Sequence, residues 1–321
     1  MASFLEQLRQ ITTLVADTGD FEALAQFNPT DATTNPSLIL DAAEKPQYAY
    51  LLDQAVAYAK VHADDHKAQS QLAFDKLLVS FGCEILKLVP GRVSVEVDAR
   101  LSFNTEATIK RSLKLIQMFE EAGVHRDRVL IKIASTWEGI QAARVLENEH
   151  QVHCNMTILM GFPQAVACAE ANATIISPYV GRIMDWHKAK TGRTYAATED
   201  PGVLSVHRIY NYYKQHGYST AVMGASFRNV GEIAQLAGCD YLTIGTALLT
   251  QLKTTQGELS QVLSLEKALA KPEPKVSLDE SSFRWELNQD AMATEKLSEA
   301  IRKFAADSDC LESILARKLE A

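Results

Sequence analysis

Eight short runs of apolar and β-branched residues alternate with longer amphipathic stretches, and this alternation restricts the possible folds more than any other feature of the chain. Such runs predict strands that are buried in parallel β/α units. The runs are ITTLVAD from Ile11, DATTNP from Asp31, VSVEVDA from Val93, VLIKIA from Val129, VHCNMTI from Val152, TIISPYV from Thr174, AVMGAS from Ala221 and YLTIG from Tyr241. Eight units predict an α/β fold of the (β/α)8 TIM-barrel type, while the pattern leaves a doubly wound open sheet as the alternative.

The stretches between these runs have the spacing of amphipathic helices. In EATIKRSLKLIQMFEEAG, for example, apolar residues recur at helical intervals and Gly123 marks the end of the helix. The last run is followed by a helical stretch, a polar segment KALAKPEPKVSLDESS, and a long helical pattern from about Asn288. We expect this tail to pack on the barrel, so that residues 1–321 form a single domain with additional N- and C-terminal helices.

Composition excludes several classes of protein. The chain has 321 residues, of which 47% are hydrophobic, and a net charge of -8, so no overall basic field attracts nucleic acid or an anionic membrane. Its five cysteines are scattered without a C-x-x-C pair, which indicates reduced thiols in a cytosolic protein. The sequence has no secretory signal pattern and no apolar run of the roughly 20 residues that a membrane helix needs. We therefore expect a cytoplasmic protein.

Polar residues interrupt the predicted strands or follow them directly. Strands of a parallel barrel are buried on both faces, so polar residues within them need a partner or a function. In a parallel barrel these residues would meet at the C-terminal mouth, where the active sites of such barrels are built. They are Asp17, Asn35, Glu96, Lys132, Asn155, Thr157, Ser177 and Ser226.

Lys132 lies inside the apolar run VLIKIA and is the most informative of these residues. One interpretation is a structural lysine that pairs with Glu96. The other is a nucleophile that forms a Schiff base, which requires a desolvated lysine with a lowered pKa because only the neutral amine attacks a carbonyl. Asp17 alone could be a helix cap, but beside Lys132 and Glu96 it supplies a second carboxylate for acid–base chemistry.

The segment MGASFRNVGEI from Met223 predicts a strand, a glycine, and then a helix. Ser226, Arg228 and the N-terminus of that helix could present donors to an anion, at the place where barrels often bind phosphate. A capped helix with an exposed arginine is the alternative. Arg182, just past the sixth strand, could add a second guanidinium, and two arginines with a serine favour a phosphomonoester.

Other motifs give no further site. His62 and His66 have the i,i+4 spacing of a metal pair, but their neighbours are polar and a third ligand is not evident, so we expect no metal. The sequence has no G-x-G-x-x-G fingerprint, no Walker A sequence and no G-x-S-x-G elbow.

The residues in these segments closely resemble those of the transaldolases, specifically the bacterial long form. The matching motifs run in order along nearly the whole chain: VADTGD, DATTNPSLI, EILKLVPGRVSVEVDARLS, RVLIKIASTWEGI, CNMTILM, ISPYVGRIMDW, MGASFRNVGEI and NQDAMATEKLSEAIRKFA. The resemblance implies a single (β/α)8 barrel, a homodimer, no metal or organic cofactor, and small-molecule sugar phosphates as ligands. It also implies transfer of a dihydroxyacetone unit from sedoheptulose 7-phosphate to glyceraldehyde 3-phosphate, in the pentose phosphate pathway.

The same resemblance implies a role for each polar residue. Lys132 would attack C2 of the ketose, Glu96 would act through a water, and Asp17 would take the proton of the C4 hydroxyl. Thr157 would orient Glu96 and its water. Substrate contacts fall to a larger set: Asn35, Asn155 and Ser177 for the three-carbon fragment, and Arg182, Ser226 and Arg228 for the phosphate.

Three positions depart from the family pattern. Tyr179 stands where the family more commonly has Phe, and a tyrosine there resembles the fructose-6-phosphate aldolases, so we expect a secondary aldolase activity. Met160-Gly161 replaces a Phe-Ser pair, and Gly245-Thr246 replaces Ala-Pro. The rival interpretations are a true aldolase and a sugar-phosphate binding protein without catalysis. The intact set of Lys132, Glu96 and Asp17 argues against the second rival.

Overall fold

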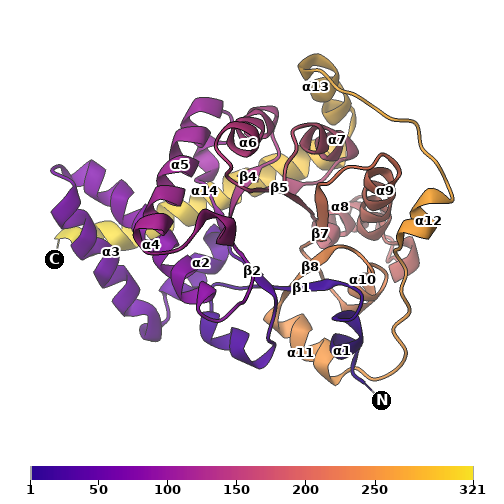
Figure 1. Cartoon of the computed structure of the whole chain (residues 1–321), viewed down its shortest axis with the longest axis horizontal. Coiled ribbons are helices and arrows are strands. Elements are labelled where there is room, and N and C mark those ends of the chain that lie inside the picture. Colours follow the sequence, from indigo (N-terminus) through magenta and orange to yellow (C-terminus); the bar gives the residue numbers. More distant parts are fainter. Residues whose placement is uncertain (1, 321) are drawn as a thin grey trace.

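The computed structural model describes residues 2–320 and contains a closed barrel of parallel strands in the order β1 to β8 (Figure 1). Each strand pairs in parallel with its neighbour in sequence, and β1 closes the barrel against β8. The strands are β1 (Thr13–Asp17), β2 (Asp31–Thr33), β3 (Val93–Glu96), β4 (Val129–Ala134), β5 (Cys154–Leu159), β6 (Ile175–Pro178), β7 (Ala221–Gly224) and β8 (Tyr241–Gly245). The barrel prediction is therefore confirmed, and the open sheet is excluded.

Helices surround the barrel and connect its strands (Figure 1). They are α1 (Phe4–Leu8), α2 (Pro36–Ala43), α3 (Ala49–His62), α4 (His66–Leu86), α5 (Thr105–Glu121), α6 (Trp137–Glu149), α7 (Phe162–Glu170), α8 (Val180–Thr191), α9 (Pro201–Gln215), α10 (Val230–Ala234), α11 (Thr246–Thr254), α12 (Leu265–Leu269), α13 (Glu280–Gln289) and α14 (Ala291–Glu320). Short 3₁₀ segments lie at Phe21–Gln26, Pro46–Tyr48, Ala99–Leu101, Arg126–Arg128 and Ala197–Glu199.

Local sequence explains where these helices begin and end. The predicted helix with the repeating apolar face is α5, which Asn104 caps through a hydrogen bond from the Ala107 backbone N–H. Gly123 follows its end with a φ of +83°, a left-handed conformation that glycine adopts at low cost. The polar segment before the tail, by contrast, is partly helical, because Asp279 caps α13 by accepting from the Ser282 N–H. That helix went unpredicted because its short apolar pattern is interrupted by charges.

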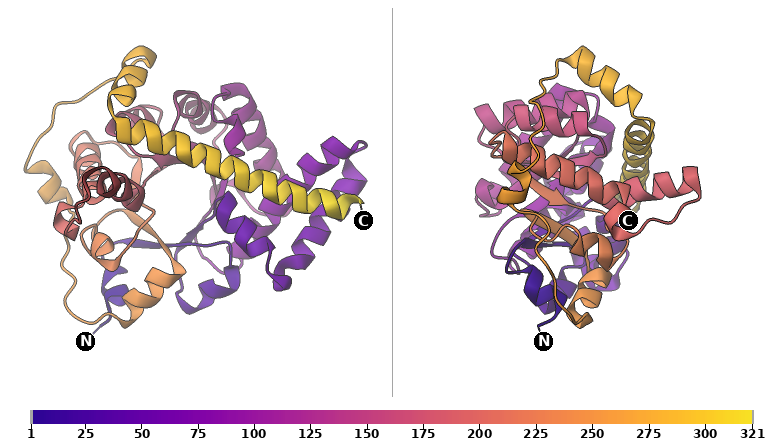
Figure 2. Two further views of the ribbon diagram at one scale, coloured as in Figure 1. Left: turned by 180° about the vertical axis from the view of Figure 1, so that it is seen from behind. Right: turned by 90° about the vertical axis from the view of Figure 1, so that its right-hand side faces the viewer.

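The predicted C-terminal helix is α14, and it crosses the barrel instead of forming a second body (Figure 2). It contacts α2, α3, α4, α8 and β5. Its first half buries apolar side chains around the mouth of the barrel, and its second half packs on the helices beside it. The buried residues recur at helical spacing: Met292, Ala293, Leu297, Ala300, Ile301, Phe304, Leu311, Leu315 and Leu319.

The interior of the barrel changes from apolar to polar along its axis. A layer of four buried side chains, Val15, Leu130, Ile175 and Met223, fills the lower part. The residues nearer the C-terminal ends of the strands are the polar ones that the sequence singled out. The apolar layer forms a dry floor beneath them, which is the usual filled interior of such barrels.

A bulge in β5 shifts the register between Met156 and Leu159. Ile158 within it has a φ of +54°, which is rare for a β-branched residue and is maintained only where the surroundings enforce it. Gln164, which is fully buried, supplies that support. Its Nε2 donates to the carbonyls of Ser135 and Ile158, and its Oε1 accepts from the backbone N–H groups of Met160 and Gly161.

We expect Gln164→Leu to lower the free energy of unfolding by at least about 3 kcal/mol, because it leaves four buried backbone groups without partners. Urea unfolding followed by circular dichroism measures the change. Gln117→Leu is the matched control, since Gln117 is exposed on α5 and bonds only to Glu121. Equal effects of the two substitutions would contradict the supporting role of Gln164.

Candidate active site

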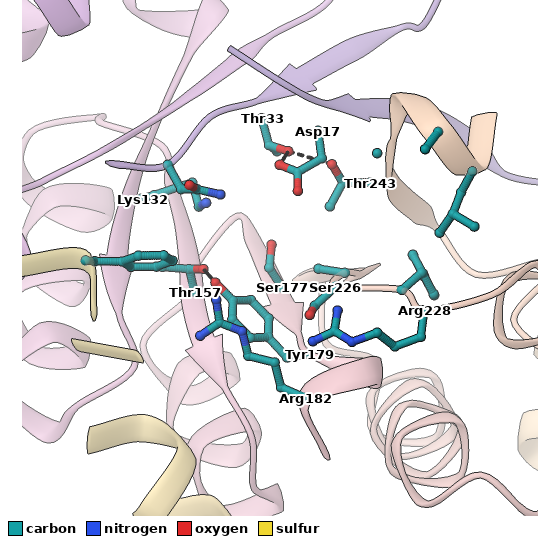
Figure 3. A pocket seen from close by; sticks show the side chains of 17 residues that line it. Asp17, Thr33, Lys132, Thr157, Ser177, Tyr179, Arg182, Ser226, Arg228 and Thr243 are labelled. Carbon is teal, nitrogen blue, oxygen red and sulfur yellow. Dashed lines mark hydrogen bonds between the residues drawn. The ribbon is translucent and has the colours of Figure 1, made fainter. Parts of the chain in front are cut away.

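The polar residues at the strand ends converge on one pocket at the C-terminal mouth (Figure 3). The pocket has a volume of ≈ 320 Å³, which suits a small-molecule ligand. Most of the predicted site residues line it: Asp17, Asn35, Lys132, Thr157, Ser177, Tyr179, Arg182, Ser226 and Arg228. Glu96 and Asn155 are predicted site residues that do not lie on its wall.

The strand register explains how Glu96, Lys132 and Asn155 come together. Glu96 pairs with Lys132 across β3 and β4, and Lys132 pairs with Asn155 across β4 and β5, so the three lie at one level of the barrel. Glu96 and Asn155 therefore lie beside Lys132 and behind the wall. Glu96 borders a separate small cavity, which Asp98 and Ser102 also line.

Lys132 is almost completely buried, with only 5% of its side chain exposed. Its Nζ donates to the backbone carbonyl of Thr34 at 2.9 Å and lies 3.3 Å from Oε2 of Glu96. Glu96 is equally buried, and Oε2 has no hydrogen-bond partner in the described part of the chain. The geometry is therefore compatible with both interpretations of Lys132. The ion pair with Glu96 fits a structural lysine, and the position of Lys132 on the pocket wall fits a nucleophile.

The pKa of Lys132 differs from the sequence-based prediction. Burial alone lowers the pKa of the amine, but Glu96, Tyr179 and Asp17 outweigh burial and the net pKa is raised. The Schiff-base interpretation requires a lowered pKa, and the acids on neighbouring strands, which sequence patterns do not show, shift the pKa of Lys132 in the other direction. Burial also raises the pKa of the Glu96 carboxyl, although Lys132 opposes part of that rise.

Asp17 ends β1 at the floor of the pocket and accepts a hydrogen bond from Thr33 Oγ1 at 2.8 Å (Figure 3). The Thr33 hydroxyl also lies 2.5 Å from the hydroxyl of Thr243 on β8. Burial raises the pKa of Asp17, while Lys132 opposes part of the rise. Asp17 caps no helix, so the capping interpretation is wrong. Thr33 and Thr243 were missed, since threonine is common in strands; their inward alternation was the available signal.

Three further side chains form a chain of hydrogen bonds on one side of Lys132. Ser177 Oγ donates to Asn155 Oδ1 at 2.6 Å, and Asn155 Nδ2 donates to Ser94 Oγ at 3.1 Å. Asn35 has a different local role, because its Oδ1 accepts from the Leu38 N–H and caps α2. The side chain therefore starts a helix and also borders the pocket.

Tyr179 places its phenol inside the pocket rather than in the core alone. Its hydroxyl lies 3.0 Å from Thr157 Oγ1, so the β5 and β6 ends are linked by this pair (Figure 3). Burial raises the pKa of the phenol, which stays protonated and able to donate. Tyr179 also belongs to the apolar cluster that includes Met160 and Phe304.

The departures at Met160-Gly161 and Gly245-Thr246 have structural consequences. A Cβ at Gly161 would lie 3.0 Å from Cβ of Ala293, so glycine allows α14 to approach this corner closely. A Cβ at Gly245 would meet no atom within 4 Å, and Gly245 lines the pocket, so glycine widens the mouth there. Thr246 begins α11.

Two arginines and a serine gather at the outer end of the pocket. Ser226 has a φ of +61°, and its carbonyl accepts from the Gly181 N–H at 2.6 Å, which joins the loop after β7 to the start of α8. A Cβ at Gly181 would lie 2.5 Å from that carbonyl oxygen, so this approach requires glycine. Arg182 projects from α8 and Arg228 reaches toward Ser226 from the opposite side (Figure 3).

The helix N-terminus after Arg228 uses one of its backbone donors for its own cap. Asn229 caps α10 by accepting from the Glu232 N–H at 3.0 Å, and Oε2 of Glu232 accepts from the Arg228 N–H at 2.7 Å. Burial raises the pKa of Glu232 to about 7. One donor of this helix terminus is therefore used by its own cap, and the side chains of Arg182, Ser226 and Arg228 supply the other donors at this end of the pocket.

Phe304 of α14 completes the pocket wall and was not predicted from the sequence. Its ring centroid lies 5.5 Å from the guanidinium carbon of Arg182, and the ring centroid of Tyr179 lies 5.1 Å from the same carbon. Cation–π contacts with these two rings orient Arg182. An apolar position in a distant helix carries no signal of this use.

Residues 2–320 show neither a metal-binding cluster nor a membrane-spanning helix. No group of three or more His, Cys, Asp or Glu side chains is arranged to hold a metal ion. No helix in that range is long and apolar enough to cross a membrane.

The barrel and the pocket at its C-terminal mouth define the chain as a (β/α)8-barrel enzyme. The sequence model of the family described as "Transaldolase/Fructose-6-phosphate aldolase" matches residues 14–315. The chain is 59% identical to "Transaldolase" of Kluyveromyces lactis over 100% of this chain and 97% of that protein. It is 57% identical to "Transaldolase" of Methylobacillus flagellatus (99% and 100%) and 57% to that of Homo sapiens (99% and 95%). The chain belongs to the transaldolase family.

We expect Asp17→Asn to raise the melting temperature at neutral pH. The pKa of the Asp17 carboxyl is raised in the folded protein, so folding favours its protonated form. As the pH rises through that pKa, the buried carboxyl must ionise and the protein loses stability. Asparagine keeps an acceptor for Thr33 and avoids the buried charge. The gain should shrink as pH falls toward the ordinary value of 3.8. Thermal melts from pH 8 down to pH 4 measure it; a lower melting temperature at neutral pH contradicts the prediction.

Proposed function

We propose that this enzyme transfers a dihydroxyacetone unit from sedoheptulose 7-phosphate to glyceraldehyde 3-phosphate, giving erythrose 4-phosphate and fructose 6-phosphate. The observation that carries the proposal is Lys132, a buried lysine that faces the pocket with Glu96 3.3 Å away. The full-length similarity to proteins named "Transaldolase" supports the same reaction. A place in the pentose phosphate pathway follows from those substrates.

In the proposed mechanism the neutral amine of Lys132 attacks C2 of the ketose and forms an imine with loss of water. The raised pKa of Lys132 requires that its proton leave first. Glu96 is the nearest carboxylate, and its own raised pKa makes it a stronger base than an exposed carboxylate. Because Glu96 lies behind the pocket wall, a water that Thr157 orients would connect it with the carbinolamine hydroxyl.

Asp17 would then accept the proton of the C4 hydroxyl as the C3–C4 bond breaks. The burial that raises its pKa suits a general base, and Thr33 holds the carboxylate in one orientation. The aldose leaves, and the three-carbon enamine on Lys132 adds to the acceptor aldehyde. Hydrolysis of the new imine releases the product ketose.

Binding roles follow from the position of each side chain. Asn35 and Ser177 line the pocket near Lys132 and would bind the hydroxyls of the three-carbon fragment, with Asn155 holding Ser177. The substrate phosphate would lie at the outer end of the pocket, where the positive charge gathers. Its donors would be Arg182, Ser226 and Arg228.

A secondary fructose-6-phosphate aldolase activity forms part of the proposal. The phenol of Tyr179 is within hydrogen-bond distance of Thr157, the residue that we propose orients the catalytic water. A second donor beside that water would favour protonation of the enamine and release of free dihydroxyacetone.

The other parts of the proposal rest on the family alone: a cytoplasmic homodimer of one domain that uses no metal or organic cofactor.

Borohydride reduction with fructose 6-phosphate should trap the fragment on Lys132, and peptide mass mapping should locate it there. Lys132→Ala should abolish both trapping and transfer. Lys87→Ala is the control, because Lys87 is an exposed lysine whose Nζ pairs with Glu84. An adduct at another lysine, or none in active enzyme, would overturn the mechanism.

Tyr179→Phe should lower the formation of fructose 6-phosphate from dihydroxyacetone and glyceraldehyde 3-phosphate by about three- to tenfold, the effect of losing one hydrogen bond. Transfer from sedoheptulose 7-phosphate should persist. Tyr213→Phe is the matched control, because it removes a buried phenol that donates to Ala165 outside the pocket. If the wild-type enzyme forms no fructose 6-phosphate from dihydroxyacetone and glyceraldehyde 3-phosphate, the proposed aldolase activity is wrong.

A further inference from the structure

The guanidinium of Arg228 binds a carboxylate beside the pocket. Its Nε and Nη2 both donate to Oδ2 of Asp185 on α8, at 3.0 Å and 2.8 Å. Both side chains are partly exposed, 41% for Arg228 and 42% for Asp185. Asp185 itself is not part of the pocket wall. One of the two arginines at the proposed phosphate end therefore has an anionic partner within the protein.

Arg182, the other arginine, is held in a different way. The rings of Tyr179 and Phe304 contact it, and no carboxylate between residues 2 and 320 pairs with its guanidinium. Aromatic rings orient a cation without neutralising it. The charge of Arg182 is therefore free for a ligand, while that of Arg228 is shared with Asp185.

The two acids that contact Arg228 also differ from each other. Glu232 is fully buried and accepts from the Arg228 backbone N–H, so it holds the loop and not the guanidinium. Asp185 binds only the end of the side chain and is open to water. A phosphate can replace the Asp185 carboxylate on the Arg228 guanidinium, because partly exposed ion pairs are weak and hydrogen bonds from arginine to phosphate are strong.

An exchangeable partner suits the reaction proposed above, on which this inference rests. In each cycle a phosphorylated aldose leaves and a phosphorylated acceptor enters while the fragment stays on Lys132. A phosphate site that binds every one of these species tightly gains nothing in turnover, since uniform binding does not lower the barrier of the chemical step. A carboxylate beside the phosphate site would weaken the binding of each phosphorylated substrate and product by a similar amount.

We propose that Asp185 is a positioning residue that sets phosphate affinity: its carboxylate binds the Arg228 guanidinium and competes with the substrate phosphate for it. Phosphate binding displaces the carboxylate from Nε and Nη2. The return of Arg228 to Asp185 accompanies product release.

The test is Asp185→Asn in the full-length enzyme, with inorganic phosphate as the probe. The inhibition constant of inorganic phosphate and the KM of fructose 6-phosphate should both fall by about two- to fivefold, the range that partly exposed ion pairs support. The kcat should not rise. Inhibition by dihydroxyacetone, which has no phosphate, should be the same in the variant and in the wild type.

Three variants complete the design. Asp64→Asn makes the same change of charge at an exposed turn between α3 and α4, and it should alter neither constant. Arg228→Ala should weaken phosphate binding. In the Arg228→Ala background, Asp185→Asn should have no further effect, because the carboxylate acts through that guanidinium.

The inference is overturned if Asp185→Asn leaves phosphate affinity unchanged or weakens it. A carboxylate that only held Arg228 in place, without competing with phosphate, would give that result. The proposed phosphate site still stands in that case if Arg228→Ala weakens phosphate. If Arg228→Ala has no effect on phosphate affinity, the phosphate site itself is wrong and the role of Asp185 falls with it. Tightening by Asp64→Asn would point to net charge instead and would also overturn the inference.

Discussion

The buried pair of Lys132 and Glu96 is the constraint on which the rest of the pocket depends. Two charges inside a barrel cost several kcal/mol each in lost hydration, and their mutual attraction offsets this only when geometry and further polar contacts are favourable. The Thr34 carbonyl supplies one such contact to Lys132. Asp17 adds a third ionisable group within the same low-dielectric space. Neighbouring strands must hold their register for these groups to meet, and the apolar layer beneath them must exclude water.

The fold was largely predictable, because it depends on a pattern that repeats. Eight apolar runs correspond to eight strands, and the polar residues at their ends mark the mouth of the barrel. Lys132 and Glu96 stood out since each interrupts a buried strand, where a charge is costly. Tertiary electrostatics were not predictable: the pKa of Lys132 follows from acids on other strands, and its raised direction is the opposite of what burial alone gives.

The site residues that sequence reasoning missed are those whose types are common in their local setting. Thr33 and Thr243 are ordinary strand residues, and Phe304 is an ordinary apolar position in a helix. Their roles arise from contacts across the barrel, between β1, β2 and β8 or between α8 and α14. At the helix terminus after Arg228 the sequence pattern also did not show that Asn229 takes up one of the backbone donors.

The crossing of α14 over the barrel also has a consequence for how the protein is made. All eight strands precede residue 291 in the chain, so a ribosome has produced the complete barrel before it produces Phe304. Until then Arg182 has only one of its two aromatic neighbours, and the apolar surface around the mouth is uncovered. The nascent chain can therefore close its sheet early, but it acquires a finished pocket only after α14 has been synthesised.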